Sequence, residues 1–327
     1  MTITRTLGRS GIEVSGLGMG CWAIGGPFWS GSQPLGWGEV DDDESVRAVR
    51  AALDLGLTFF DTANVYGAGH SERVLGRALG ADRDRVVIAT KWGNTFDEQT
   101  RQTGERDASA DGLLKALHAS LSRLGTDWID LYQLHLGDLP LEDALALVPV
   151  LDGLVDAGRI RTFAWSTDDP ERAAAFAAAS PSVTAVQHDL SVLRDNPDMI
   201  AVCERDNLAS VNRGPLAMGL LTGKYTAQSR LGADDVRGIA PQWLSYFEDG
   251  RPSATWLARV AAVREILTSG GRTLAQGALG WLWARSDRTV PIPGCRTVAQ
   301  VEENAGALAH GPLTAEQVTE IDHLLDR

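Results

Sequence analysis

The sequence predicts a closed (β/α)8 barrel, and three observations support this fold class. Short β-branched or aromatic runs alternate with amphipathic helical stretches along almost all of the 327 residues. This alternation is typical of parallel strands joined by crossover helices. Eight strand–helix units can be counted, a number that favours a closed barrel over an open sheet. Barrels of this kind often exceed 250 residues as one domain, so we expect residues 1–327 to form a single domain.

The expected strands are short runs of apolar and β-branched residues, and the expected helices are longer amphipathic stretches. The strands are predicted at Val14–Gly20, Leu57–Asp61, Val86–Lys91, Trp128–His135, Ile160–Trp165, Ala185–Gln187, Ala209–Asn212 and Thr289–Ile292. The helices between and after them are predicted at Glu44–Leu55, Ser71–Leu79, Asp111–Leu124, Leu141–Ala157, Pro170–Ala179, Pro197–Arg205, Leu274–Ala284 and Val298–Ala309. Two further helices are expected at Ser253–Thr268 and Ala315–Leu325.

Two segments lie outside this repeat. The chain opens with a predicted β-hairpin, Thr4–Leu7 and Ile12–Val14, which we expect to cap the bottom of the barrel. The long segment Gly223–Arg251 follows the seventh strand and therefore falls on the C-terminal face, where barrel sites are built. The glycines at Gly16–Gly20 precede no helix and lack the GxGxxG spacing, so an open dinucleotide-binding sheet is not favoured.

Composition excludes several classes of partner. The chain has 30 Lys and Arg against 43 Asp and Glu, a net charge of −13, which argues against nucleic acid as its main partner but not against a small anionic cofactor. It has no run of 18 apolar residues and no secretory signal, so no membrane segment is expected. Its three cysteines are far apart and form no CxxC pair, which predicts a cytoplasmic location. No pattern indicates the oligomeric state.

Three chemically versatile side chains stand where neighbouring strands end. Asp61, Lys91 and His135 close the second, third and fourth strands, and Tyr66 lies in the loop just after Asp61. A tyrosine with an ordinary pKa of about 10 is a poor acid at neutral pH. A nearby Lys91 ammonium is expected to lower that pKa, while Asp61 keeps the lysine charged. His135 can then donate a hydrogen bond to a substrate oxygen.

Each of these residues also has a plain structural interpretation. A lone aspartate at a strand end is often a helix cap, and a lone lysine is often a surface side chain. All four at adjacent strand ends favour one shared site. The other histidines are expected to be solvated and without a role: His70, His118, His188, His310 and His323. Because His-x-His and Glu-x-x-His ligand spacings are missing, no catalytic metal is expected.

At this point the sequence resembles the aldo-keto reductases. Asp61–Gly76 is similar to the first signature of that family, and Leu131–His135 to the second. Gly214–Tyr225 and Ile292–Asn304 are similar to its cofactor loops, and the order and spacing agree over nearly the whole chain. The resemblance implies that Tyr66 is the general acid/base, with Asp61, Lys91 and His135 as the other catalytic residues. It also implies hydride transfer between NADP(H), extended across the barrel mouth, and a carbonyl carbon.

The resemblance further implies a set of cofactor-binding residues. Ser166 and Gln187 match positions that hold the carboxamide, Cys21 and Trp22 a site beside the nicotinamide ribose, and Lys224 approaches the pyrophosphate. Arg296 is expected to contact a 2′-phosphate beside a helix N-terminus with free amides, and Glu303 and Asn304 the adenine amino edge. The complete implied set is Cys21, Trp22, Asp61, Ser166, Thr167, Gln187, Arg213, Gly214, Pro215, Leu216, Ala217, Gly219, Lys224, Gly294, Arg296, Thr297, Gln300, Glu303 and Asn304.

Three positions depart from the family pattern. Thr167 replaces the usual asparagine after the fifth-strand serine, and Leu190 replaces a tyrosine found in many relatives. Arg213 occupies the position where an aromatic ring normally stacks on the nicotinamide. A guanidinium can stack, but its charge disfavours the cationic oxidised ring, so we expect a preference for the reduced cofactor.

The substrate pocket is predicted to be aromatic. Trp22, Phe28, Trp29 and Trp92 fall near mouth-side strand ends, and Trp243 or Tyr246 can join them from the long loop. Such walls suit an apolar aldehyde or ketone. The sequence therefore predicts NADPH-dependent reduction of small-molecule carbonyls to alcohols. The alternatives are an NADP(H)-binding regulatory or redox-sensing subunit with little turnover and, disfavoured by the missing ligand spacings, a metal-dependent hydrolase on the same barrel.

Overall fold

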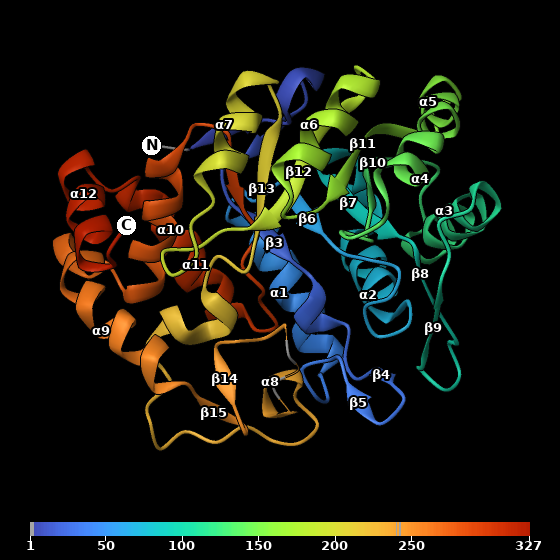
Figure 1. Cartoon of the computed structure of the whole chain (residues 1–327). Coiled ribbons are helices and arrows are strands. Elements are labelled where there is room, and N and C mark those ends of the chain that lie inside the picture. The colour runs from blue at the N-terminus through green and yellow to red at the C-terminus, as the bar shows by residue number, and fades with distance from the viewer. Residues whose placement is uncertain (1–2, 240, 242) are drawn as a thin grey trace.

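Eight parallel strands form the centre of the computed structural model, which describes residues 3–239, 241 and 243–327 (Figure 1). Pairing follows chain order, and a parallel bridge between Gly20 and Gly294 joins the first strand to the last. The predicted (β/α)8 TIM-barrel fold is confirmed. The strands are β3 (Gly18–Gly20), β6 (Phe59–Asp61), β7 (Val87–Trp92), β10 (Ile129–Leu134), β11 (Ile160–Ser166), β12 (Val183–Asp189), β13 (Ala209–Arg213) and β16 (Thr289–Pro291).

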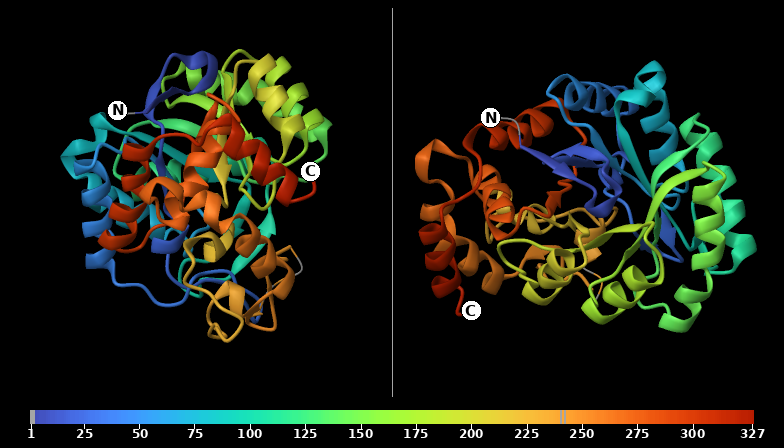
Figure 2. Two further views of the ribbon diagram at one scale, coloured as in Figure 1. Left: turned by 90° about the vertical axis from the view of Figure 1, so that its left-hand side faces the viewer. Right: turned by 90° about the horizontal axis from the view of Figure 1, so that it is seen from above.

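Helices surround the strands, as the view along the barrel shows (Figure 2, right). The expected helix Leu141–Ala157 is wrong as a single element, because it is divided into α4 (Leu141–Ala146) and α5 (Val148–Asp156). Pro149 lies in the first turn of α5 and lacks the N–H that a continuous helix requires. The other major helices are α1 (Asp42–Asp54), α2 (His70–Leu79), α3 (Ala110–Leu124), α6 (Pro170–Ala179), α7 (Pro197–Arg205), α9 (Ala254–Leu267), α10 (Leu274–Arg285), α11 (Val298–His310) and α12 (Ala315–Leu324).

The N-terminal hairpin lies at the end of the barrel opposite the mouth. Its strands are β1 (Thr4–Thr6) and β2 (Glu13–Ser15), so the predicted hairpin is confirmed (Figure 1). The predicted strand Val14–Gly20 is divided between β2 and β3. The break falls at Gly16, whose backbone N–H donates to the Ile3 carbonyl at 2.7 Å. A side chain there would collide with Ile3.

Strand alternation separates two apolar layers. Ala89 and Leu131 point into the barrel, and the outward residues face the helices. Lys91 lies two residues after Ala89 and therefore also points inward. Trp92 points outward, is completely buried, and stacks on Tyr132 with ring centroids 6.1 Å apart. The expectation that Trp92 lines the substrate pocket is wrong, because the pleat turns its side chain toward the helices.

Several short segments gather at the barrel mouth, at the lower side of Figure 1. They are β4 (Trp29–Ser30), β5 (Gln33–Pro34), β8 (Asn94–Phe96), β9 (Thr103–Arg106), α8 (Val236–Ile239), β14 (Phe247–Glu248) and β15 (Arg251–Pro252). The long segment after the seventh strand contacts the residues after β5, since the Val236 N–H donates to the Gly36 carbonyl at 2.9 Å. Within the part of the chain described, no helix is long and apolar enough to cross a membrane.

Asp130 links strand β7, which carries Lys91, to strand β10, which ends just before His135. Its buried carboxylate, on β10, accepts a hydrogen bond from the Ile88 N–H of β7 at 2.9 Å and pairs with the largely buried Arg83 at 2.8 Å. The half-exposed Arg161 pairs with the same carboxylate at 3.0 Å. Removing one partner of a buried ion pair leaves the other charge without compensation.

We expect Asp130→Ala to lower the free energy of unfolding by about 3–5 kcal/mol, because Arg83 and the Ile88 N–H lose a buried acceptor. Arg161→Ala, the matched control, should cost less than about 1 kcal/mol because water can replace its contact. Denaturant unfolding of both variants measures the difference. Equal losses in the two variants would contradict the importance assigned to the buried pair.

Candidate active site

Four side chains meet inside the barrel mouth: Asp61, Tyr66, Lys91 and His135. The Lys91 ammonium donates to Asp61 Oδ1 at 2.5 Å, to the Thr62 carbonyl at 2.9 Å and to the Tyr66 hydroxyl at 3.2 Å. The His135 ring stands edge-on to the Tyr66 ring, with centroids 5.9 Å apart. The predicted grouping of an acid, a base and a phenol therefore exists as a contiguous cluster.

The turn after β6 places Tyr66 above Lys91. Gly67 adopts a positive φ of 60°, and a side chain there would stand 1.7 Å from the Gly25 carbonyl oxygen. Only glycine permits this contact between the two mouth loops. The Ser71 hydroxyl, at the start of α2, bonds to the Thr62 hydroxyl at 2.8 Å and donates to the Cys21 carbonyl at 2.7 Å. The phenol is thus fixed by its backbone as well as by Lys91.

Burial and charge set the protonation states of this cluster. Burial favours neutral Lys91, but Asp61 and Tyr66 outweigh that effect and raise the pKa of the ammonium. Burial raises the pKa of Tyr66 above its ordinary value, although Lys91 acts in the opposite direction. The expectation of a lowered tyrosine pKa is therefore wrong, because burial outweighs the neighbouring charge of Lys91. Burial, together with Lys91 and Arg213, holds the pKa of His135 well below its usual range.

The second oxygen of Asp61 is held by two amides. Gln133 Nε2 donates to Asp61 Oδ2 at 2.9 Å, and Gln187 Nε2 donates to the same oxygen at 2.7 Å. All three side chains are buried. Sequence reasoning missed Gln133, although one signal could have found it. Gln133 lies two residues after the inward-pointing Leu131 and shares its face of β10.

Aromatic rings cover one side of Tyr66. Trp22 stacks on it with centroids 5.8 Å apart, and Trp22 in turn contacts Trp37 at 5.2 Å and Trp243 at 6.4 Å. Phe28 lies in an apolar cluster that Tyr66 and Trp22 pack against. The structure thus brings Trp22 and Phe28 to the site and adds Trp37, which the sequence analysis had not selected. Trp29 lies in β4, and its role at the pocket stays a prediction.

Ser166, Gln187 and Arg213 end or nearly end three adjacent strands, β11, β12 and β13. Arg213 forms an ion pair with Asp168, and both side chains are about half exposed. The Thr167 hydroxyl donates to the Gly137 carbonyl at 2.9 Å and so secures a neighbouring loop. Thr167, Gln187 and Arg213 are therefore already engaged with protein groups.

A group of cations lies farther along the mouth. Lys224 and Arg296 have no carboxylate within ion-pair distance among the residues described, whereas Arg237 pairs with Asp235 at 2.5 Å. Burial, Arg237 and Arg296 together lower the pKa of Lys224. Arg296 also donates to the Trp37 carbonyl at 3.2 Å. Two cations that form no ion pair within the described part of a chain of net charge −13 fit a phosphate-bearing ligand.

The helix N-terminus beside Arg296 differs from expectation. The Thr297 hydroxyl accepts from the Gln300 N–H, and the Glu44 carboxylate accepts from the Val298 N–H at 2.9 Å. The expectation of free amides at the start of α11 is therefore wrong for these two groups. Asn304 is buried and its amide donates to Cys295 Sγ at 3.1 Å, so its Nδ2 already has a partner within the protein.

The predicted cofactor loop after β13 has an unusual backbone. Ala217, Met218 and Gly219 take positive φ values of 48°, 54° and 95° in succession. Leu216 and Ala217 are buried, while Gly214, Pro215 and Gly219 belong to the same loop.

The expectation that His188 is solvated is wrong. It is completely buried, bonds to the Ser210 hydroxyl at 2.7 Å, and burial lowers its pKa to about 4.

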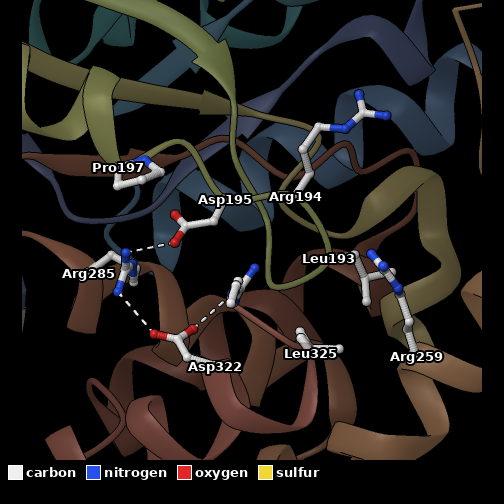
Figure 3. A pocket seen from close by; sticks show the side chains of 9 residues that line it. Leu193, Arg194, Asp195, Pro197, Arg259, Arg285, Asp322 and Leu325 are labelled. Atoms are coloured by element: carbon white, nitrogen blue, oxygen red, sulfur yellow. Dashed lines mark hydrogen bonds and ion pairs between the residues drawn. The ribbon is translucent and has the colours of Figure 1, made fainter.

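A cavity of about 570 Å³ lies outside this site, between the loop after β12 and helices α9, α10 and α12 (Figure 3). Arg285 pairs there with Asp195 at 2.7 Å and with Asp322 at 3.6 Å. Arg285 thus joins the loop after β12 to helix α12, and the lining holds four arginines against two aspartates. Among the residues described, no group of three or more His, Cys, Asp and Glu side chains is placed to hold a metal ion.

Comparison with known proteins supports the resemblance. A sequence model of the Aldo/keto reductase family matches residues 16–326. The aldo-keto reductase YhdN of Bacillus subtilis is 31% identical over 98% of this chain and 93% of its own length. The aldo-keto reductase yakc [NADP(+)] of Schizosaccharomyces pombe is 33% identical over 93% of this chain and 86% of its own length.

Among solved structures, the glycerol dehydrogenase AKR11B4 of Gluconobacter oxydans superposes with a TM-score of 0.81 at 29% identity. The match covers 99% of this chain and 95% of the dehydrogenase. The family match spans both the catalytic cluster and the cation group. The chain belongs to the aldo/keto reductase family of oxidoreductases.

Proposed function

We propose that this protein is an NADPH-dependent reductase that converts aldehydes and ketones to alcohols. One observation carries the proposal: a buried Lys91 ammonium, held by Asp61 at 2.5 Å, donates to the Tyr66 hydroxyl at 3.2 Å. A phenol in that position is a proton donor whose conjugate base is stabilised by an adjacent cation. The hydroxyl lies beneath an aromatic wall that suits a carbonyl substrate.

NADPH, when bound, supplies the hydride that adds to the carbonyl carbon. Tyr66 then gives its proton to the carbonyl oxygen, and the charge left on the phenol is stabilised by Lys91. Asp61 keeps the lysine protonated and aimed. Burial and the nearby cations hold the pKa of His135 well below its usual range. Its Nδ1 atom is enclosed by protein, so we assign the other ring nitrogen, Nε2, to orienting a substrate oxygen. The reverse reaction uses the same groups with the proton returning to Tyr66.

Several groups support NADP(H) as the cofactor. Lys224 and Arg296 supply the charge for the pyrophosphate and the 2′-phosphate, and a similar protein, yakc, carries NADP(+) in its name. Gln187 accepts no hydrogen bond at Oε1 within the described structure, which suits a carboxamide N–H donor. We assign the remaining residues of the implied set to cofactor binding by family resemblance.

The ion pair of Arg213 with Asp168 changes the expected effect of Arg213 on cofactor preference. Its charge is balanced by Asp168, so the bias against the oxidised nicotinamide is smaller than for an isolated guanidinium. The guanidinium plane is nevertheless held at the end of β13, beside the expected position of the ring.

The substrates proposed are small carbonyl compounds with an apolar or aromatic part, since Trp22, Trp37 and Phe28 surround Tyr66. The similarity to a glycerol dehydrogenase adds polyols and their aldehydes to the candidates. We propose the cytoplasm as the compartment, because all three cysteines are free and buried.

Replacing Tyr66 by Phe should lower the rate of aldehyde reduction by about 10²–10⁴-fold, because the proton donor is lost while the ring remains. NADPH consumption with an aromatic aldehyde and with glyceraldehyde measures this loss, and quenching of tryptophan fluorescence checks that the cofactor still binds. If the parent binds NADPH but consumes none across a panel of carbonyls, the protein is instead a cofactor-binding subunit.

Replacing Arg296 by Ala should raise the KM for NADPH by about 10- to 100-fold, because a charge-assisted contact to the 2′-phosphate is lost. The KM for NADH should change by less than about twofold because NADH lacks that phosphate. Arg205→Ala is the control, since Arg205 is a surface arginine of α7 paired with Asp206. Equal changes for both cofactors would remove Arg296 from the 2′-phosphate site.

A further inference from the structure

We propose that Gln133 is a positioning residue for proton transfer, which holds Asp61 on Lys91. This inference rests on the proposed reductase function for its catalytic meaning, although the hydrogen-bonded chain itself does not depend on it. The chain runs from Gln187 through Gln133 and Asp61 to Lys91 and Tyr66 inside the barrel.

The geometry leaves Asp61 with no unsatisfied oxygen. Oδ1 accepts from Lys91, and Oδ2 accepts from Gln133 at 2.9 Å and from Gln187 at 2.7 Å. A carboxylate buried this deeply is stable as an anion only when its oxygens receive such donors. If the Gln133 donor were removed, Oδ2 would keep only Gln187 as a donor, and the carboxylate would be held less firmly on Lys91.

The direction of each amide follows from the chemistry of its partners. Because a charged carboxylate only accepts hydrogen bonds, both glutamines must present their NH2 groups to Asp61. The second N–H of Gln187 donates to Gln133 Oε1 at 3.2 Å. Both hydrogens of the Gln187 amide are therefore engaged, and its Oε1 is the atom left to face the carboxamide. Asp61 thus fixes which end of Gln187 faces the carboxamide, and Gln133 adds a second contact to the same amide.

This arrangement links cofactor binding to proton transfer. We expect the Oε1 atom of Gln187 to face the carboxamide, and its Nε2 atom donates to Asp61. Gln133 is hydrogen-bonded to both Asp61 and Gln187. When a carboxamide engages Gln187, Gln133 remains as a donor that keeps Asp61 in place. The residue acts through Asp61 and Lys91 and is not expected to touch substrate.

The test compares Gln133→Met with a matched control, Thr162→Val. Methionine keeps the length of the side chain and removes the N–H donor. Thr162 is also buried, lies on the neighbouring strand β11, and donates to the Asp130 carbonyl at 2.9 Å without contacting Asp61. Three quantities are measured: kcat for aldehyde reduction, the Kd for NADPH, and the ultraviolet titration of Tyr66, isolated as the difference between each protein and its Tyr66→Phe form.

For Gln133→Met we expect kcat to fall about 10- to 100-fold, as for loss of a hydrogen bond to a charged group. The Kd for NADPH should change by less than about threefold, because Gln187 keeps its bond to Asp61. The Tyr66 titration should move to higher pH, because a Lys91 ammonium that Asp61 holds less firmly stabilises the Tyr66 phenolate less. Thr162→Val should lower the melting temperature but leave kcat and the titration unchanged.

If Gln133→Met fails to fold, a second variant, Gln133→Glu, tests the proposed role of Gln133. A glutamic acid donates to Asp61 only while protonated, so activity should be retained at low pH and lost as the introduced acid ionises. The proposal is overturned by parental kcat and titration in Gln133→Met, by an equal effect in Thr162→Val, or by a loss confined to NADPH affinity. If the parent reduces no carbonyl, the reductase function fails, but the titration still decides the role of Gln133.

Discussion

The buried ion pair between Lys91 and Asp61 is the interaction on which the rest of the site depends. Both side chains are almost completely inaccessible. Removing two charges from water is costly, and their attraction offsets that cost only when every remaining donor and acceptor is satisfied. Here Lys91 donates to three acceptors, and Asp61 accepts from three donors. The pair and its partners comprise five side chains and the Thr62 carbonyl. The barrel makes this possible, because parallel strands present their inward residues at one end.

The same constraint explains why the phenol lies where it does. Tyr66 is the one partner of Lys91 that can exchange a proton at the mouth, since Asp61 is enclosed by amides and Thr62 offers a carbonyl. Its backbone is set by the close approach of Gly67 to Gly25. Proton chemistry is thereby confined to the phenol, whereas the charge that governs it lies deeper in the barrel.

Much of this arrangement could be predicted from the sequence. The strand and helix pattern predicted the barrel and its hairpin, and the positions at strand ends predicted that Asp61, Lys91 and His135 would meet. The site predictions that were wrong or missing depended on the direction in which a side chain points. Trp92 adjoins Lys91 in sequence but points to the other layer, and Gln133 was overlooked although it shares an inward face with Leu131. The contacts of Glu44 with the start of α11 and of Asp168 with Arg213 join distant segments, so no local pattern could reveal them.

The central claim is that the charge of Lys91, held by Asp61, controls proton donation by Tyr66. The most direct measurement is the single-turnover rate of hydride transfer to an aldehyde in Lys91→Met at saturating NADPH. The account predicts a fall of at least about 10²-fold, with NADPH affinity close to that of the parent. A transfer rate equal to the parent rate would contradict it, because proton donation would then not require the ammonium.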